Sequence, residues 1–398
     1  MILIIRILSF IAVLLPGINL NAASYDFGGF ASLETRLFSH TPLYSQQEHH
    51  NVSLALQPEF DYEWQNGTLL TFTGFARLDS SDEERSRVDI RELSLFWPTD
   101  LLETRIGISK IYWGVTEFFH LVDIINQTDL IESLDMEEKL GQPMLQLTMS
   151  RDWGTVDFFI LPYFRERTFP GIEGRLRAAL IVDHNTATYE SSDKEHHIDL
   201  ALRFSNTVGN WDFGLSHFRG TGREPLLSPT RNQAGESVLS PFYEQISQTS
   251  FDIQGAIGSW LLKFEALHRN GSQEEFYAAT GGVEYTFYNL GSTSMDLGII
   301  GEWAWDERGE EATTLFDNDL MLGLRLAVND QASTEALFGI AQDADSSARI
   351  LTLEASRRLT DGLKISCKAA FFLDFADDDP GSYLRQEDFF FAEIKYYF

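Results

Sequence analysis

The stretch Asn51-Val-Ser-Leu-Ala-Leu-Gln-Pro-Glu-Phe-Asp-Tyr-Glu-Trp64 alternates between apolar and polar side chains for fourteen residues. Its even-numbered positions, from Val52 to Trp64, are apolar or aromatic, and its odd-numbered positions carry mostly polar and acidic side chains. Successive side chains of a β-strand point to opposite faces of the sheet, so this segment has one apolar and one polar face. A typical strand of a soluble protein has only about 5–6 residues. The length of the alternation therefore predicts a strand that crosses a membrane with its apolar face toward lipid.

The same alternation recurs along the rest of the chain, most clearly over 295–305 and 362–375. The pattern predicts eighteen strands, near residues 25–37, 50–64, 68–79, 86–97, 103–113, 143–151, 154–164, 196–206, 209–218, 243–257, 259–270, 276–288, 293–305, 316–328, 332–342, 347–357, 362–375 and 386–398. Short, turn-like connections between these strands alternate with longer and often acidic ones. We therefore predict an all-β fold, a transmembrane antiparallel β-barrel of about 18 strands (range 16–18), with short periplasmic turns and long acidic outer loops.

The composition agrees with this class and excludes others. The 398 residues include 60 acidic and 30 basic side chains, a net charge of −30 that repels the phosphates of nucleic acids. The single cysteine, Cys367, excludes a disulfide framework and a multi-cysteine zinc site. After residue 22, no apolar run approaches the ~18 residues that a membrane-spanning helix requires.

Residues 1–22 have the pattern of an export signal. Arg6 is the only charge, Ile7 to Leu15 form the apolar stretch, and small residues near Ala22 suit cleavage. An exported chain without disulfides fits the bacterial envelope. We therefore expect residues 23–398 to form one β-barrel that is integral to the bacterial outer membrane.

The last strand ends on an aromatic residue, with Phe390, Ala392, Ile394, Tyr396 and Phe398 on one face. This ending resembles the terminal strand of bacterial outer-membrane barrels. The resemblance implies that the barrel assembly machinery recognises the chain through Phe398. Outer-membrane lipid and lipopolysaccharide are the other expected partners, an inner-membrane transporter is a candidate partner, and no nucleic acid is expected.

Two further stretches resemble a narrower group. Ile106-Gly-Ile-Ser-Lys-Ile-Tyr-Trp-Gly114, followed by Leu121-Val-Asp-Ile-Ile-Asn-Gln-Thr-Asp-Leu130, is similar to the alginate-export-type porins and related uncharacterised outer-membrane proteins, with Gln127 where that group usually has proline. Pro162-Tyr-Phe-Arg-Glu-Arg-Thr-Phe-Pro-Gly171 has the look of the same group. The resemblance implies an 18-strand pore that passes an exported or imported solute, and it leaves the solute open.

Segment 114–142 is the candidate for a loop that narrows this pore. It is long and combines apolar residues such as Phe118, Phe119 and Leu121 with acidic ones. A loop with so many apolar side chains is expected to fold into the barrel rather than extend into water. The alternative is an outward cap that packs on other loops.

The inward phases of the strands carry more acidic than basic side chains, and a barrel of this width holds water. We therefore expect a channel for a small or polymeric hydrophilic solute, with mixed charges in the lumen and a modest preference for cations. The expected pore-lining or substrate-contacting residues are Arg91, Arg105, Glu117, Asp123, Asp129, Arg165, Arg167, Arg203 and Arg325. Arg165 and Arg167, with Arg175 and Arg177, also form a basic cluster, which either binds an anion such as a lipopolysaccharide phosphate or pairs with the acidic loops.

Other readings of the inward positions stay open. Six phenylalanines fall on inward phases and would suit a carrier of hydrophobic molecules or lipids, or would follow from local bulges that reverse the phase: Phe30, Phe75, Phe159, Phe372, Phe389 and Phe391. Ser216 and His217 are a nucleophile and a base side by side, but neighbouring side chains of a strand point apart. The same holds for the adjacent histidines at 49–50 and 196–197 as metal ligands. We therefore expect no catalytic, cofactor or metal site, and no enzyme.

Overall fold

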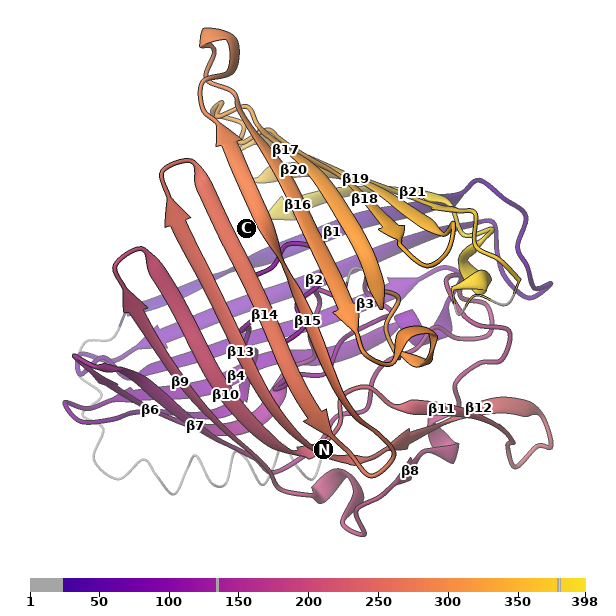
Figure 1. Cartoon of the computed structure of the whole chain (residues 1–398), viewed down its shortest axis with the longest axis horizontal. Helices are drawn as coiled ribbons and strands as arrows, with labels where there is room; N and C mark the ends of the chain where they lie inside the picture. Colours follow the sequence, from indigo (N-terminus) through magenta and orange to yellow (C-terminus); the bar gives the residue numbers. More distant parts are fainter. Residues whose placement is uncertain (1–23, 134–135, 378, 380) are drawn as a thin grey trace.

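The computed structural model describes residues 24–133, 136–377, 379 and 381–398, and the export signal expected at residues 1–22 lies outside them. The described chain forms a closed barrel in which 18 strands pair antiparallel, and the first strand also pairs with the last (Figure 1). The barrel strands are β1 (Ser24–Phe38), β2 (His50–Glu63), β3 (Leu69–Asp79), β4 (Arg87–Pro98), β5 (Glu103–Ser109), β6 (Gln142–Arg151), β7 (Gly154–Leu161), β9 (Asp199–Val208), β10 (Trp211–Thr221), β13 (Gln245–Ile257), β14 (Trp260–Asn270), β15 (Glu275–Phe287), β16 (Asp296–Asp306), β17 (Asn318–Ala327), β18 (Glu335–Asp343), β19 (Arg349–Thr360), β20 (Leu363–Leu373) and β21 (Phe389–Tyr397). The predicted class and strand number are confirmed.

Most connections follow the predicted alternation of short and long, but the β14–β15 and β18–β19 connections of the long set are short. Gln65-Asn66-Gly67 closes the β2–β3 turn, where the amide of Gly67 donates to the carbonyl of Trp64 and its positive φ of 78° favours glycine. Short turns of this kind lie at the rim that holds the two ends of the barrel chain, Ser24 and Phe398. The long connections gather at the opposite rim, which we call the outer rim (Figure 1).

The outer rim carries structure that the alternation did not predict. β8 (Thr188–Tyr189), β11 (Leu226–Arg231) and β12 (Ser237–Tyr243) form a separate three-stranded sheet. The helical elements in the described residues are six single turns: η1 (Glu83–Arg85), η2 (His184–Thr186), η3 (Lys194–His196), η4 (Leu290–Ser292), η5 (Gly309–Glu311) and η6 (Ser382–Leu384). None of these helices has the length and apolarity to cross a membrane.

The faces of the strands have the predicted polarity. In β2, Val52, Leu54 and Leu56 are 41–56% exposed on the outer surface, whereas Ser53 and Ala55 are 1% and 5% exposed on the lumenal side. Alternate residues of a strand face opposite ways, so the apolar set meets lipid and the polar set meets the lumen.

The lumen also contains a hydrophobic core. Trp113, Val122, Ile124 and Ile125 come from the connection between β5 and β6, and they pack on inward side chains of β6, β7, β9, β10 and β13. The ring of Trp113 lies 5.8 Å from that of Phe159, edge to face. Phe159 therefore faces the lumen, as its phase predicts. The inserted chain covers its ring, so this apolar side chain is not exposed to water.

Candidate functional site

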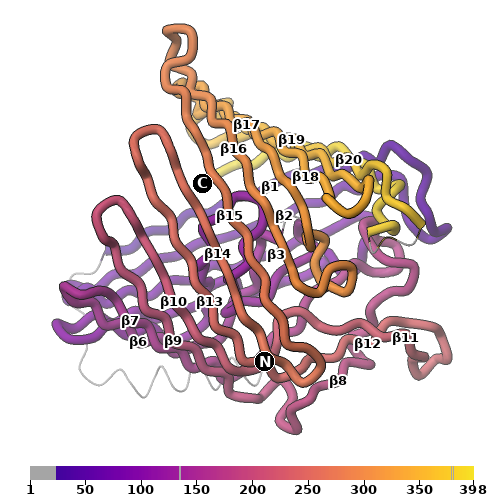
Figure 2. The backbone as a smooth tube through the Cα atoms, viewed as in Figure 1, coloured from indigo at the N-terminus to yellow at the C-terminus, as the bar shows by residue number. Residues whose placement is uncertain are grey.

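The connection from Lys110 to Gly141, which we call the inserted segment, lies inside the barrel over its described residues, 110–133 and 136–141 (Figure 2). It leaves β5 at Ser109, four residues earlier than the sequence suggests, because the chain turns inward there. Its tip reaches the far wall, where the ring of Phe118 lies against Gly323 of β17 and Gly339 of β18. A Cβ atom at either glycine would come within 2.9 Å of that ring. Glycine at both positions thus permits the close approach.

Two buried glutamates of the wall hold the outgoing half of the inserted segment. Glu265 of β14 accepts hydrogen bonds from the amides of Val115, Thr116 and Val122 at 2.6–3.0 Å, and from the hydroxyl of Thr116 at 2.7 Å. Glu302 of β16 accepts from the amides of Glu117 and Phe118 at 2.8–3.1 Å. Backbone donors that would otherwise be buried without partners are thereby satisfied by charged acceptors.

The returning half is held by arginines from the opposite wall. Asp129 is fully buried and receives Arg87 and Arg91 of β4, the latter at 2.6 Å. Although burial by itself raises the pKa of Asp129, these two guanidinium groups hold it below its usual value. Glu132 pairs with Arg77 of β3 at 2.8 Å. The inserted segment is therefore fixed at both walls.

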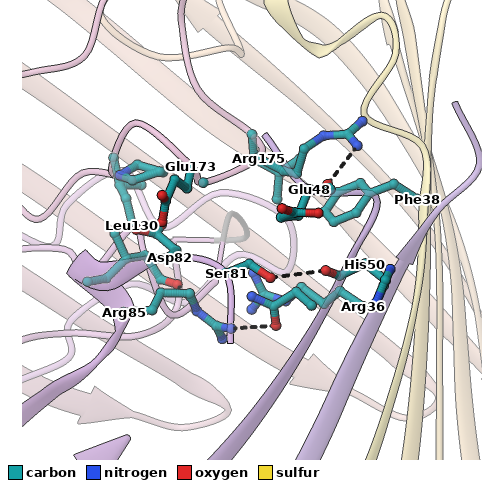
Figure 3. Close-up of a pocket in the computed structure, with 15 residues that line it drawn as sticks. Arg36, Phe38, Glu48, His50, Ser81, Asp82, Arg85, Leu130, Glu173 and Arg175 are labelled. Atoms are coloured by element: carbon teal, nitrogen blue, oxygen red, sulfur yellow. Dashed lines mark hydrogen bonds between the residues drawn. The ribbon is translucent and has the colours of Figure 1, made fainter. Parts of the chain in front are cut away.

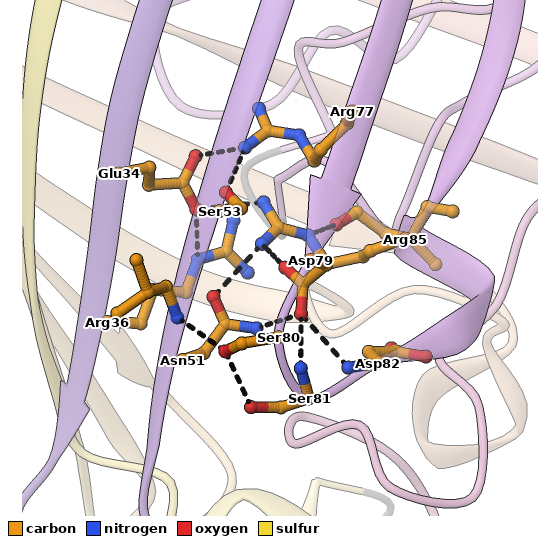
Figure 4. Close-up of polar contacts among 12 residues, drawn as sticks. Glu34, Arg36, Asn51, Ser53, Arg77, Asp79, Ser80, Ser81, Asp82 and Arg85 are labelled. Carbon is orange, nitrogen blue, oxygen red and sulfur yellow. Dashed lines mark hydrogen bonds and ion pairs between the residues drawn. The ribbon is translucent and has the colours of Figure 1, made fainter.

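Glu34 of β1 links Arg77, which holds Glu132, to two further arginines (Figure 4). Glu34 pairs with Arg77 and Arg85, each at 2.8 Å, and with Arg36 at 3.1 Å. Arg85 also pairs with Asp79 at 2.7 Å and donates to the carbonyl of Ile131 at 2.8 Å. Removing one member of such a buried network leaves an uncompensated charge, which typically costs about 3–5 kcal/mol.

Two large cavities lie on either side of the inserted segment. The outer chamber, about 1970 Å³ with its open solvent, is bounded by the outer connections and by β17–β20, and its lining is mainly apolar, including Phe118, Phe169 and Phe372. The vestibule, about 1810 Å³, lies toward the rim of the short turns and is lined by many charged side chains, among them Arg77, Arg325 and Lys395.

The two cavities meet at a set of residues that we call the neck. The side chains that line both cavities are Glu117, Ser133, Glu137, Leu176, Leu337, Glu354, Lys368 and Phe389. Three of them belong to the inserted segment and four to β18–β21. Lys368 pairs with Glu354 across the β19–β20 ladder at 2.9 Å. The two cavities therefore adjoin at the neck, which β18–β21 bound on one side.

No protein-family model and no curated protein matches the chain. Among solved structures, a BenF-like porin from Pseudomonas fluorescens Pf-5 aligns over 95% of this chain and 98% of its own, with 9% identity and a TM-score of 0.56. The outer membrane protein OmpT of Vibrio cholerae, in its trimer form, aligns over 95% and 100%, with 11% identity and a TM-score of 0.47.

The chain has the fold of an outer-membrane porin. That fold agrees with the expected place of the chain in the bacterial outer membrane. At these identities the likeness is one of fold, so the narrower resemblance to alginate-export-type porins stays a prediction.

Four of the predicted residues line the cavities of this porin-like barrel. Glu117 lies in the neck and pairs with Arg325 at 2.5 Å and with Lys263 at 3.4 Å. Arg91 and Arg325 line the vestibule, and Arg167 lines the outer chamber, where its Nε donates to Gln127 at 3.2 Å. The porin-like lumen thus brings Glu117 and Arg325 into contact from distant parts of the sequence.

The other five predicted residues have different surroundings. The prediction that Asp123 and Asp129 line the passage is wrong, because both side chains are buried against the inserted segment's own backbone or against arginines. Asp123 accepts from the amides of Trp113 and Gly114 at 2.7 and 3.0 Å. These two acidic side chains are buried and hold the inserted segment in place.

Arg203, Arg165 and Arg105 are likewise removed from the neck. Arg203 makes two hydrogen bonds with Asp252 of β13, at 2.6 and 2.8 Å. Arg165 pairs with Asp89 at 2.9 Å. Arg105 lies over the ring of Phe96 near the periplasmic end of β5.

The basic cluster expected at residues 165–177 does not converge on one site. Arg175 pairs with Glu387 at 2.8 Å and donates to the carbonyl of Glu48 at a small pocket of the outer rim (Figure 3). Arg177 donates to the carbonyls of Ile172, Ala178 and Ala179. Carboxylates therefore neutralise two of these four charges, those of Arg165 and Arg175.

Sequence reasoning missed most of the neck. Glu354 and Lys368 lie on inward phases, which the alternation shows, but their pairing depends on the register of β19 against β20. Ser133 and Glu137 depend on the path of the inserted segment. Alternation alone assigns a face to each side chain, but it fixes neither the exact cross-strand partner nor the path of the inserted segment.

Proposed function

We propose that the protein is an outer-membrane channel through which a small solute passes from the outer chamber, through the neck, to the vestibule. One observation supports this most directly: two cavities on opposite sides of the inserted segment share lining residues. Cavities that adjoin in this way need only a passage between the neck residues to form a continuous route. The fixed position of the inserted segment favours a small solute over a polymer.

The two cavities suggest how a solute is sorted. An apolar outer chamber binds the hydrocarbon part of a solute, and the charged vestibule keeps the route hydrated. Arg167 and Arg177, which line the outer chamber, have no carboxylate within ion-pair distance among the described residues, so no ion pair neutralises their positive charges.

The test is a conductance measurement on the purified barrel in planar bilayers. We expect discrete, ohmic single-channel steps for the wild type. A variant that lacks residues 115–138 should conduct more, because the segment that narrows the lumen is gone. Absence of steps from correctly folded protein would refute the channel, and unchanged conductance in the variant would refute the narrowing role.

The mainly apolar lining of the outer chamber also favours a second candidate, a carrier of hydrophobic molecules. Swelling of proteoliposomes in small sugars separates the two functions. A channel admits sugars at a rate that falls with their size. A hydrophobic carrier excludes them and instead retains apolar molecules during purification.

A further inference from the structure

An acidic side pocket lies at the outer rim, between η5, the outer ends of β17 and β18, and residues 375, 376, 379 and 381. It encloses about 890 Å³ with its open solvent, and it shares Thr314, Leu315, Ala341 and Ile350 with the outer chamber. Its lining carries six carboxylates: Glu310, Asp317, Asp319, Asp343, Asp345 and Asp379. No arginine, lysine or histidine is among its described lining residues.

Asp319 is the carboxylate of this group that is both buried and incompletely hydrogen-bonded. Its side chain faces the pocket and the residue is only 4% exposed. Its Oδ2 is buried and has no hydrogen-bond partner among the described residues. A buried, unpaired carboxylate oxygen is costly unless it is neutralised or bound.

The register places a second carboxylate directly opposite. Asp319 of β17 pairs with Asp343 of β18, and side chains in such a cross-strand pair are typically about 4.5–5.5 Å apart at Cβ. Like charges in this position repel each other. Asp317, just before β17, is affected as well, because burial and then the charge of Asp343 raise its pKa above the usual value.

Neighbouring groups hold these carboxylates in place. Asp345 accepts from the side-chain amide of Asn318 at 2.7 Å, and the backbone amide of Asp345 donates to Asp343 at 2.8 Å. Asp317 accepts from the amide of Asn318 at 3.0 Å. The two adjacent strands therefore hold these carboxylates close together. Rotation of one exposed side chain does not relieve the repulsion between them.

We propose that this side pocket binds a hydrated divalent cation, Ca²⁺ or Mg²⁺, with Asp319 and Asp343 as its direct ligands and Asp317 and Asp345 acting through water. Among the described residues, no group of three or more His, Cys, Asp and Glu side chains is arranged to hold a bare metal ion. The ion consequently keeps several waters, as Mg²⁺ and weakly bound Ca²⁺ commonly do. The bound cation links β17 to β18 beside the outer chamber.

Binding of the cation goes beyond solute passage and does not depend on it. The test therefore uses the full-length protein in detergent micelles, after treatment with EDTA and exchange into metal-free buffer. CaCl₂, MgCl₂ and spermidine are titrated separately by calorimetry, and thermal unfolding is recorded with and without each cation. The variants are Asp319→Asn and Asp343→Asn, and the matched control is Asp361→Asn, an exposed aspartate at a periplasmic turn.

We expect saturable binding of one Ca²⁺ or Mg²⁺ per chain, and a rise in unfolding temperature because the ion binds the folded state. Either pocket variant should weaken binding at least ten-fold. Asp319→Asn should also unfold at a higher temperature than the wild type in EDTA, since it removes the repulsion, and should gain no further stability from the cation. Asp361→Asn should match the wild type throughout.

Three results would overturn the proposal. One is the absence of saturable divalent binding by folded wild type. Another is equal binding by wild type and both pocket variants, which would indicate general charge screening. The third is saturable binding of spermidine without Ca²⁺ or Mg²⁺, which would make the pocket a polyamine site. If Asp319→Asn fails to fold, Asp343→Asn provides the same test. None of these outcomes uses channel conductance, so the cation site is tested separately from the proposed channel.

Discussion

At the scale of single residues, β20 shows how sharply the lumen and the lipid are divided. The vestibule wall includes residues 366–368, and the alternation places Ser366 and Lys368 on the lumenal face. Cys367 shares its phase with Phe371, which is 44% exposed on the outer surface. One peptide step therefore changes the environment of a side chain from water to hydrocarbon.

We predict that Cys367 in folded protein reacts slowly with a membrane-impermeant maleimide in liposomes, because its thiol faces lipid. The matched control moves the thiol by one residue, with Ser366→Cys in a Cys367→Ala background. This variant should react many-fold faster through the lumen. Equal rates at the two positions would contradict the assigned face.

Glu265 shows how one lumenal side chain positions the inserted segment. It is fully buried and accepts four hydrogen bonds from that segment. In Glu265→Gln, an amide nitrogen replaces an acceptor and faces an N–H group. We expect a loss of about 1–3 kcal/mol in the free energy of unfolding, as for an unsatisfied buried donor.

The same variant should show noisier single-channel currents, since the tip of the inserted segment is less firmly held. The control is Glu275→Gln on β15, where the carboxylate is mostly exposed. If Glu265→Gln has the stability and the current noise of the wild type, the prediction is wrong. Glu302 and the arginines would then be sufficient to hold the inserted segment.

At the scale of elements, the connection between β7 and β9 is stabilised by a titratable contact. His184 Nδ1 lies 2.8 Å from Glu166, and Tyr189 of β8 also donates to that carboxylate. The hydrogen bond with Glu166 raises the pKa of His184 above its usual value. The protonated pair thus stabilises this connection fully below the unfolded pKa of about 6.5, and the effect is lost as pH rises through the folded pKa.

We predict that limited proteolysis of the 162–198 connection accelerates between pH 6 and pH 8.5 relative to a pH-matched control substrate. His184→Gln should remove this pH dependence, because no charge is gained or lost there. His196→Gln, a change at an exposed side chain in the same connection, should keep it. An identical pH profile in His184→Gln would assign the effect to other groups.

At the scale of the whole molecule, the net charge of −30 and the acidic outer rim set the field around the channel. Cations concentrate near such a mouth before entry, and the effect weakens as salt shortens the screening length to about 10 Å at 0.1 M. In the neck, Lys368 pairs with Glu354, and Arg325 at the vestibule side pairs with Glu117, so mobile ions meet few unpaired positive charges there.

We therefore predict a modest cation preference in a KCl gradient, larger at low than at high salt. Reversal potentials of the wild type measure this directly. Anion preference at both salt concentrations would contradict it and would point to Arg167 and Arg177 as the dominant charges. Substituting both by glutamine would then shift the reversal potential toward cations.

The sequence by itself determined that the chain forms a barrel and which side chains of each strand face the lumen or the lipid. An alternation such as that of residues 51–64 is a local property of the backbone, because each residue's side is set by its immediate neighbours. Repeated along the chain, it was sufficient for the strand number and for the inward position of Phe159.

Only the tertiary structure decided which charges meet. Glu117 contacts Glu302, 185 residues away, and pairs with Arg325, because the inserted segment crosses the closed barrel. The same path buries Asp123 and Asp129 as anchors, although their polarity made them candidates for the passage. Register around the barrel likewise places Asp319 opposite Asp343 and Glu354 opposite Lys368. These pairings depend on closure and chain path over long sequence separations, and local alternation carries no information about either.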